Sequence, residues 1–398
     1  MDPTETLDPV RLAERLGALE PDAVAGAGGV GAIEVVRAPG RVNLIGEHTD
    51  YNLGLVLPVA IDLEIRLAVV PTDDRLVRLT RLDDVSVGAF DLAAIEPASG
   101  AWIDYPAGVA WALDGAGLPL RGLRGVIASS LPAGAGLSSS AALELATAWA
   151  LLGAEAPGIT PLELARIAQR AENVHVGVAC GLMDQFAAAC GTREGALLLD
   201  CRSLGYATVP LPLDAVALVI CDTGSPRRLE TSAYNDRRAD CETAVAILSA
   251  EDPSIRSLRD VSEAALPWAS TRLDPVVFRR VRHVVTEDAR VTATVDALRA
   301  GDLATVGEAF AASHASLRDD YEVSSPALDV MVAMALDVPG VLAARMTGAG
   351  FGGSTVNLVR PDAVAALAAA VETRYPERTG YRPTIRVVRP ADGAGRVR

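Results

Sequence analysis

The sequence contains no lysine, so arginine supplies all 36 of its basic residues. This absence excludes a phosphate-binding loop of the G-x-x-x-x-G-K-[ST] type, because such a loop uses its lysine to reach the terminal phosphates. The basic residues are outnumbered by 51 acidic ones, and the formal net charge is -15. A chain with this surplus of negative charge is a poor match for nucleic acid or an anionic membrane surface. We expect neither partner, and we expect a local arginine or Mg²⁺ site wherever an anionic substrate binds.

Cysteine is also scarce. The five cysteines form no C-x-x-C pair, and their odd number argues against a framework of disulfides. The N-terminus lacks the basic and apolar regions of a signal peptide, and no run approaches the roughly 18 apolar residues of a spanning helix. We expect a cytoplasmic protein in a reducing environment, and a monomer.

What the chain does have is length and apolar content: 398 residues, of which 50% are hydrophobic. This is enough for more than one core. A shift in composition near Asp200 predicts two domains, residues 1–200 and 201–398.

Hydrophobic periodicity and turn residues predict the main elements. We predict strands at residues 33–37, 55–59, 65–70, 85–90, 125–130, 196–200, 216–222 and 355–359. We predict helices at residues 10–20, 108–113, 141–152, 161–176, 227–241, 278–298 and 303–318, a last helix ending at 375, and a linker at 25–31.

The stretch Pro132–Ala142 reads P-A-G-A-G-L-S-S-S-A-A and lies between a predicted strand and a predicted helix. Gly134 and Gly136 allow the backbone to approach a ligand closely. The hydroxyls of residues 138–140 stand at a helix N-terminus, whose free N–H groups and positive dipole favour a phosphate. From the residues alone two interpretations stay open, a phosphate site and an ordinary serine-capped helix.

The densest group of polar side chains occurs in residues 38–51, which we expect to form an irregular loop. It contains Arg41, Glu47, His48 and Asp50. Carboxylates and an imidazole can exchange several hydrogen bonds with the hydroxyls of a sugar ring. The alternative is a solvated polar turn.

Two further features stand out. Asp184 is the only carboxylate in the nearly uncharged stretch from residue 177 to 191, and a lone acid in apolar surroundings is costly unless it is paired or used; the alternatives are a helix cap and a buried structural acid. Trp102 and Tyr105 lie close together in a chain with only 4% aromatic residues. They could stack on a purine or pack in the core.

In combination, these segments resemble the galactokinase family. Five blocks occur in the family's order: Gly40–Asn52, Gly134–Ala142, Cys180–Phe186, Ser316–Ser324 and Met346–Ser354. The first block resembles the signature of sugar-1-kinases of the galactokinase type, and the two glycine-rich blocks are similar to loops of the wider GHMP kinase superfamily. The resemblance extends from about residue 33 to residue 360.

The resemblance implies a fold of the α+β class, the two-domain GHMP kinase fold. The N-terminal domain would be a mixed sheet with helices (ribosomal protein S5 domain 2-like). The C-terminal domain would be a ferredoxin-like α/β sandwich, with the active site in the cleft between the two.

The resemblance also implies a reaction: transfer of the γ-phosphate of ATP to the C1 hydroxyl of α-D-galactose, giving galactose 1-phosphate and ADP, with Mg²⁺ as cofactor. Carried over by position, Asp184 would be the base at the C1 hydroxyl and Arg41 the cation beside it. An arginine beside a carboxylate favours its ionised form, and it can also stabilise charge on the transferring phosphoryl group.

The remaining site residues follow by position from the same resemblance. The sugar hydroxyls would be held by Glu47, His48, Asp50, Gly181 and Tyr234. The nucleotide would be held by Trp102, Tyr105, Pro132, Gly134, Ala135, Gly136, Leu137, Ser138, Ser139 and Ser140. Mg²⁺ would be held by Glu172 and Ser140, or by Ser139 in its place, and glycines 348–353 would close the site from the other domain. Ala135 departs from the family's usual glycine.

Two other functions stay open. One is a related GHMP sugar-1-kinase, such as an N-acetylgalactosamine kinase, although His48 and Asp50 favour galactose. The other is a non-catalytic sensor that binds galactose and ATP. The intact Asp184, Arg41 and serines 138–140 argue against a sensor.

Overall fold

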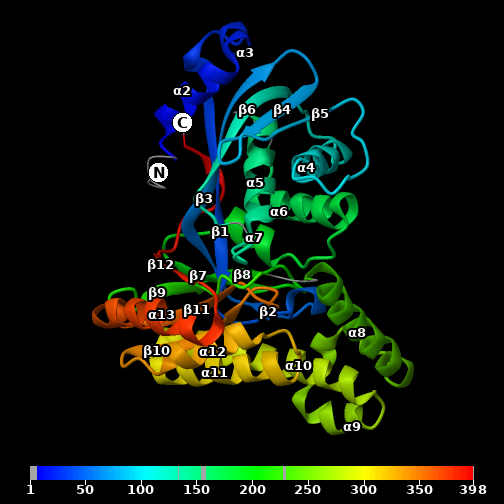
Figure 1. Ribbon diagram of the computed structural model, residues 1–398. Coiled ribbons are helices and arrows are strands. Elements are labelled where there is room, and N and C mark those ends of the chain that lie inside the picture. Colours follow the sequence, from blue (N-terminus) through cyan, green and yellow to red (C-terminus); the bar gives the residue numbers. More distant parts are fainter. Residues whose placement is uncertain (1–6, 133, 154–157, 227–229, 398) are drawn as a thin grey trace.

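The computed structural model describes residues 7–132, 134–153, 158–226 and 230–397, without the side chains of residues 230–232. Ala133 of the predicted phosphate loop and the predicted start of a helix at residues 227–229 lie outside this part. In Figure 1 the described chain forms an upper part around one large sheet and a lower part around a second sheet.

The first sheet has six strands in the order β13-β1-β3-β6-β4-β5. Only the β4–β6 pair is parallel, so the sheet is mixed. The strands are β1 (Glu34–Asn43), β3 (Pro58–Thr72), β4 (Leu76–Arg81), β5 (Val87–Asp91), β6 (Gly122–Ser129) and β13 (Gly395–Arg396).

Helices cover both faces of this sheet (Figure 1). On one face lie α4 (Asp104–Gly115), α5 (Ser139–Leu152), α6 (Pro161–Arg170) and α7 (Met183–Cys190), of which α5 and α7 contact β1 and β3. On the other face, α2 (Pro9–Leu19) contacts β3 and β6, and α3 (Pro21–Gly26) follows it. The buried alanine-rich sequence of α5 allows this helix to pack closely between the sheet and its neighbours.

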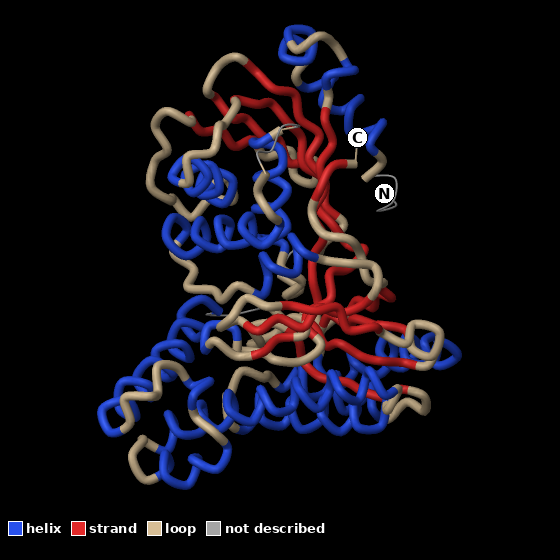
Figure 2. Tube along the Cα trace, turned by 180° about the vertical axis from the view of Figure 1, so that it is seen from behind, coloured by secondary structure: helices blue, strands red, loops and turns tan. Residues whose placement is uncertain are grey.

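The second sheet has four antiparallel strands in the order β10-β11-β9-β12. Figure 2 shows helices below it. Its strands are β9 (Ala217–Asp222), β10 (Val341–Thr347), β11 (Ser354–Val359) and β12 (Thr384–Val388), and the helices of this half are α8 (Glu230–Glu251), α9 (Leu266–Ser270), α10 (Pro275–Ala300), α11 (Leu303–Asp319), α12 (Pro326–Leu336) and α13 (Val364–Thr379).

A third sheet of three strands connects the halves. It contains β2 (Leu55–Val56), β7 (Gly195–Asp200) and β8 (Tyr206–Pro210), and α10 of the C-terminal half packs against β2 and β8. The largest hydrophobic core continues from Leu67 and Leu145 to Phe310 and Leu358, and β13 returns the chain end to β1. The division at residue 200 stays a prediction.

Most predicted elements are present, and the helix predicted at 161–176 shows how local sequence directs one. Thr160 caps α6 in a capping box, in which its hydroxyl accepts from Glu163 N and the Glu163 carboxylate accepts from Thr160 N. Pro161 occupies the first turn, where its missing N–H costs nothing. The last six residues, Ala171–Val176, form a π-helix rather than a further α turn.

The structure also corrects several predictions. Residues 38–43 belong to β1 rather than to the predicted loop, and residues 41–43 pair with residues 58–60 of β3. The predicted linker at 25–31 instead contains the end of α3 and a short helix at Val30–Ala32. The sequence patterns do not predict β4, β8, β10, β12 or α12. Asp329 is the only charged residue of α12, whose apolar sequence therefore has no clear amphipathic period.

Two absences hold for the described residues. No helix in this part is both long and apolar enough to cross a membrane. All five cysteines are free, as the sequence predicts.

Candidate active site

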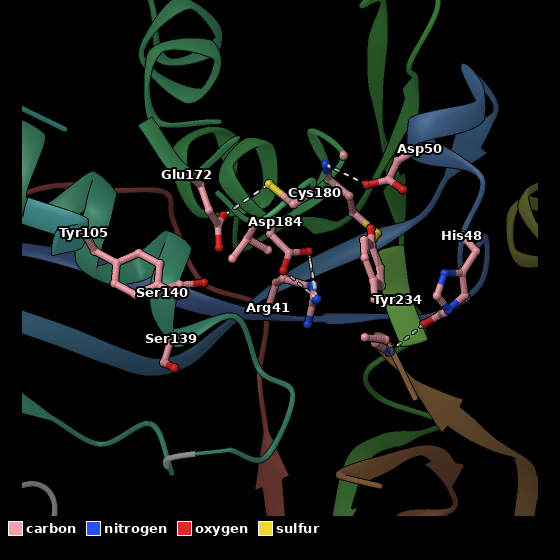
Figure 3. Close-up of a pocket in the computed structure, with 16 residues that line it drawn as sticks. Arg41, His48, Asp50, Tyr105, Ser139, Ser140, Glu172, Cys180, Asp184 and Tyr234 are labelled. Atoms are coloured by element: carbon pink, nitrogen blue, oxygen red, sulfur yellow. Dashed lines mark hydrogen bonds and ion pairs between the residues drawn. The ribbon is translucent and has the colours of Figure 1, made fainter. Parts of the chain in front are cut away.

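A cavity of about 330 Å³ lies between the helices of the six-stranded sheet and the C-terminal half (Figure 3). Most of the residues predicted from the sequence line it: Arg41, Glu47, His48, Asp50, Tyr105, Ser139, Ser140, Glu172, Gly181, Asp184 and Tyr234. They come from β1, the following loop, α4, the N-terminus of α5, the π-helix, the segment before α7, α7 itself and α8. Segments far apart in the chain therefore meet at one site.

Arg41 and Asp184 lie at the centre of the cavity lining (Figure 3). Arg41 Nε and Nη2 donate to the two carboxylate oxygens of Asp184, each at 2.8 Å. This fork is the strongest geometry for a guanidinium and a carboxylate. Ser138 Oγ donates to Asp184 Oδ2 at 2.5 Å, and Arg41 Nη1 donates to Gly136 O at 2.7 Å. The fork thus also holds the glycine-rich loop.

A close approach of two backbones brings that loop to β1. Arg41 N donates to Leu137 O at 3.1 Å. A Cβ at Gly40 would lie 2.6 Å from Leu137 O and 2.4 Å from Leu131 Cδ2, so only glycine fits there. The register of β1 and β3 also shifts between Pro39 and Arg41, which places a bulge beside the arginine.

Asp50 faces the cavity from the loop after β1. Its Oδ1 accepts from Tyr51 N at 3.0 Å, and its Oδ2 accepts from Met183 N at 3.4 Å. A Cβ at Gly181 would lie 1.8 Å from Asp50 Oδ2, so glycine at that position makes room for the carboxylate. Burial, and then the charge of Asp184, raise the pKa of Asp50 to about 6.

His48 lines the same end with a left-handed backbone, at φ 63°. Its Nδ1 forms a hydrogen bond with Tyr51 OH at 2.9 Å, and Tyr51 OH bonds with Tyr321 OH at 2.8 Å. The ring of Tyr234 lies 5.6 Å from the imidazole, centre to centre. Burial lowers the pKa of His48 to about 3, so the imidazole is neutral at physiological pH.

Glu172 lies at the opposite end of the cavity (Figure 3), and Glu144 lies behind it, outside the cavity lining. Gln185 Nε2 donates to Glu172 Oε2 at 2.5 Å and to Glu144 Oε2 at 3.0 Å, and the Cys180 thiol donates to Glu172 at 3.2 Å. Burial raises the pKa of Glu172 to about 7, and burial with the neighbouring Glu172 raises that of Glu144 further. Among the described residues, no arginine or histidine forms a salt bridge with either carboxylate.

This end fits a divalent cation. Glu144 Oε1 is buried without a partner among the described groups. Without a counter-charge the raised pKa values favour protonated carboxyl groups, and a bound hard cation would favour their ionised form. Ser140 stands beside Glu172 in the cavity lining. Within the described ranges no group of three or more His, Cys, Asp or Glu residues could hold a metal alone, so phosphate oxygens and water would complete the shell.

Some predicted nucleotide residues do not line the cavity: Trp102, Pro132, Gly134, Ala135, Gly136, Leu137 and Ser138. Trp102 packs against the core, with the guanidinium of Arg81 5.9 Å from its ring. Ser138 occupies the N-cap position of α5 in a left-handed conformation without a side-chain capping hydrogen bond, and its hydroxyl donates to Asp184 instead.

The cavity also contains residues to which the sequence assigned no role: Val178, Cys180, Met183 and Ala349. Cys180 and Met183 belong to a block that marks the resemblance, so that block was the available signal. Ala349 belongs to the block Met346–Ser354, which carries the same signal, and nothing local marks Val178.

Comparison with known proteins decides the family. The model of the galactokinase galactose-binding signature matches residues 28–71, that of the GHMP kinase N-terminal domain residues 104–192, and that of the GHMP kinase C-terminal domain residues 294–377. The galactokinase of Roseiflexus sp. (strain RS-1) is 49% identical over 91% of this chain and 93% of its own length. The chain belongs to the galactokinase family. The galactokinase of Chloroflexus aurantiacus is 48% identical to it over 87% of this chain and 89% of its own length.

Solved structures agree with this membership. Lactococcus lactis galactokinase, solved in complex with galactose, superposes with a TM-score of 0.90 and 37% identity, covering 96% of this chain and 100% of that one. Methanococcus jannaschii mevalonate kinase gives a TM-score of 0.66 over 91% of this chain at 18% identity and shows the fold alone. The predicted GHMP kinase fold is confirmed, and the chain is a kinase that uses ATP.

Proposed function

We propose that this chain transfers the γ-phosphoryl group of ATP to the C1 hydroxyl of α-D-galactose and releases galactose 1-phosphate and ADP. The C1 oxygen forms a bond to the γ-phosphorus, the bond from that phosphorus to the β–γ bridging oxygen breaks, and the bridging oxygen leaves with ADP. The hydroxyl proton passes to Asp184. The single observation that supports this most is the fork between Arg41 and Asp184, set in a cavity that holds both the sugar loop and the serines of α5.

Asp184 and Arg41 act together in this reaction. Asp184 accepts the hydrogen bond of the attacking hydroxyl and so orients the oxygen. Arg41 fixes the rotamer of the carboxylate through two hydrogen bonds, and its charge stabilises the negative charge that spreads over the transferring phosphoryl group. Positioning and electrostatics supply most of the catalysis of such a transfer.

The sugar is held by groups of different hydrogen-bonding character. Asp50, when ionised, only accepts hydrogen bonds, whereas the neutral His48 can donate from one nitrogen. Tyr234 adds an aromatic face and a hydroxyl, and Gly181 leaves room for the Asp50 carboxylate. Galactose is the substrate proposed because the L. lactis relative was solved with galactose and the galactose-binding signature spans this loop.

The nucleotide phosphates are proposed to lie against the loop of residues 134–140, with Tyr105 near the base. Ser140 and Glu172, or Ser139 in place of Ser140, would hold Mg²⁺. Bound there, the cation would supply charge neutralisation of the phosphate oxygens. The lysine-free sequence leaves arginine and this cation as the positive groups for the phosphates.

An ADP-release assay with four sugars tests the proposal: galactose, glucose, 2-deoxygalactose and N-acetylgalactosamine. We expect turnover with galactose well above that with glucose. Preference for N-acetylgalactosamine would favour a sibling sugar-1-kinase. Binding of galactose without ADP release from any sugar would favour a sensor.

We further propose that the chain acts as a monomer in the cytoplasm and that its two domains divide near residue 200. Light scattering during size exclusion tests the first statement. A dimeric mass at assay concentration would contradict it.

A further inference from the structure

Arg345 lies on β10, an edge strand of the four-stranded sheet, yet its side chain has no exposed surface. Its Nη2 lies 2.6 Å from Glu47 Oε2, and its Nη1 donates to Leu44 O at 2.7 Å. Both partners belong to the segment that leads from β1 into the sugar loop. A buried arginine of the C-terminal half therefore reaches into the sugar signature.

The carboxylate of Glu47 is held from three directions. Besides the ion pair with Arg345, Oε2 accepts from Asn43 Nδ2 at 2.8 Å, and Oε1 accepts from Gly348 N at 3.0 Å. Only 1% of the residue is exposed. Burial raises the pKa of Glu47, and Arg345 opposes that rise. Glu47 thus joins three segments at the edge of the sugar site.

A second acid and a second arginine complete a buried, charge-balanced network. Glu287 Oε1 accepts from Gly46 N at 3.0 Å and lies 3.9 Å from Arg345 Nη2. Arg290 Nε donates to Glu287 Oε2 at 2.7 Å. Arg290 shares Glu287 with Arg345, but no contact of Arg290 with Glu47 is present among the described residues, which makes it a matched control.

The loop that begins at Gly348 also touches the nucleotide loop. A Cβ at Gly348 would lie 3.2 Å from Gly136 O, the same oxygen that accepts from Arg41 Nη1. At the other end of the loop, Ser354 Oγ donates to Ala135 O at 2.7 Å. A shift of Gly348 would therefore displace the nucleotide loop at Gly136 and, through Gly136 O, the guanidinium of Arg41.

We propose that Arg345 is a positioning residue that, through Glu47 and the loop beginning at Gly348, sets the spacing between the sugar site and the nucleotide loop. This inference rests on the proposed function and deepens it. The sugar site and the nucleotide loop both contact Glu47 or the loop beginning at Gly348. Each ligand therefore orders part of the other ligand's site, and the two ligands bind with positive coupling. Galactose therefore binds more tightly when a non-hydrolysable ATP analogue is present, by about tenfold.

Isothermal titration of galactose, with and without the analogue and Mg²⁺, measures this coupling in the full chain. In Arg345→Met we expect the coupling to fall to about twofold or less and the Kd for galactose alone to rise at least tenfold. In Arg290→Met we expect a lower melting temperature with coupling and Kd within twofold of wild type. Arg345→Lys, which keeps the charge, should recover part of the coupling.

Loss of coupling in both methionine variants, or in neither, would overturn the inference, as would a wild-type chain without coupling. If Arg345→Met does not fold, Arg345→Lys and the neutral pair Glu47→Gln with Arg345→Met give the same comparison. Failure of the proposed function is distinguishable, because it appears as a wild-type chain that releases no ADP with galactose, whereas the titration needs no turnover.

Discussion

The sugar end and the nucleotide end of the cavity differ in how their carboxylates are compensated. At the sugar end, Arg41 donates two hydrogen bonds of 2.8 Å to Asp184. Behind it, Arg345 lies 2.6 Å from Glu47. Each of these two acids has an arginine of its own.

At the nucleotide end, Glu144 and Glu172 have between them only the neutral amide of Gln185. Burying charges without counter-charges is costly. At the sugar end, Asp184 and Glu47 therefore have their counter-charges before a ligand binds, whereas Asp50 forms no ion pair among the described residues. The nucleotide end depends on cations that arrive with the nucleotide. The comparison predicts that substitutions at the two ends affect different ligands.

The largest effect should follow the removal of charge at the nucleotide end. We expect Glu172→Gln to weaken the binding of Mn²⁺ in the presence of ADP by about 100-fold, the upper end of the loss seen when groups around a metal ligand are changed. Galactose affinity should stay within twofold, because the sugar end keeps its own counter-charges. Electron paramagnetic resonance of free Mn²⁺ measures the first quantity and calorimetry the second.

The matched control for this test is Glu96→Gln, an exposed acid of the same half. It should change neither quantity. Equal losses of Mn²⁺ and galactose affinity in Glu172→Gln would break the comparison, since the two ends would then not be separate.

An effect of roughly tenfold is expected from pH at the sugar end. The pKa of Asp50 is raised to about 6, so the carboxylate is mostly ionised at pH 7 and mostly protonated at pH 5. Protonation removes an acceptor, and the Kd for galactose should rise roughly tenfold between these pH values. In Asp50→Asn the affinity should be weak and nearly independent of pH across this range.

The same residue links function to stability. A carboxyl whose folded pKa lies above its unfolded value binds more protons in the folded state, so the free energy of unfolding falls as pH rises from about 4 to above 6. We expect Asp50→Asn to raise the free energy of unfolding at pH 7.5 by about 1–3 kcal/mol. The exposed control Asp73→Asn should leave it within 0.5 kcal/mol, the usual range for surface changes; no gain in Asp50→Asn would contradict the burial argument.

The smallest effect concerns the hydroxyl between the two ends. Ser138 Oγ donates to Asp184 at 2.5 Å, and a net hydrogen bond is worth about 1 kcal/mol. Ser138→Ala should therefore lower kcat about fivefold, with the KM values for galactose and ATP nearly unchanged. Ser203→Ala, at an exposed turn, is the control. A change in the ATP KM alone would instead assign Ser138 to the nucleotide.

Parts of this site could be predicted from the sequence because they are local. The polar group of Glu47, His48 and Asp50 lies within four residues, and the serine-headed helix α5 follows from its glycines and alanines. The meeting of Arg41 and Asp184 came from the resemblance, since nothing in the spacing of two residues 143 positions apart indicates a contact.

Other parts could not be predicted because they depend on tertiary contacts. Arg345 is one of 36 basic residues and lies in a strand that the pattern did not indicate. Residues 38–43 have the composition of a loop, since proline, glycine and asparagine favour turns, but pairing with β3 overrides that preference. Glu144 reads as an ordinary polar residue of a helix until the fold buries it beside Glu172.

The most direct measurement compares Asp184→Asn with the exposed control Asp214→Asn in two assays, galactose binding by calorimetry and ADP release at saturating substrates. We predict that Asp184→Asn binds galactose within a few-fold of wild type but turns over about 100-fold or more slowly, the range that a positioned acid–base group supplies. Asp214→Asn should match wild type in both assays. Unchanged turnover in Asp184→Asn would contradict the role assigned to the fork with Arg41.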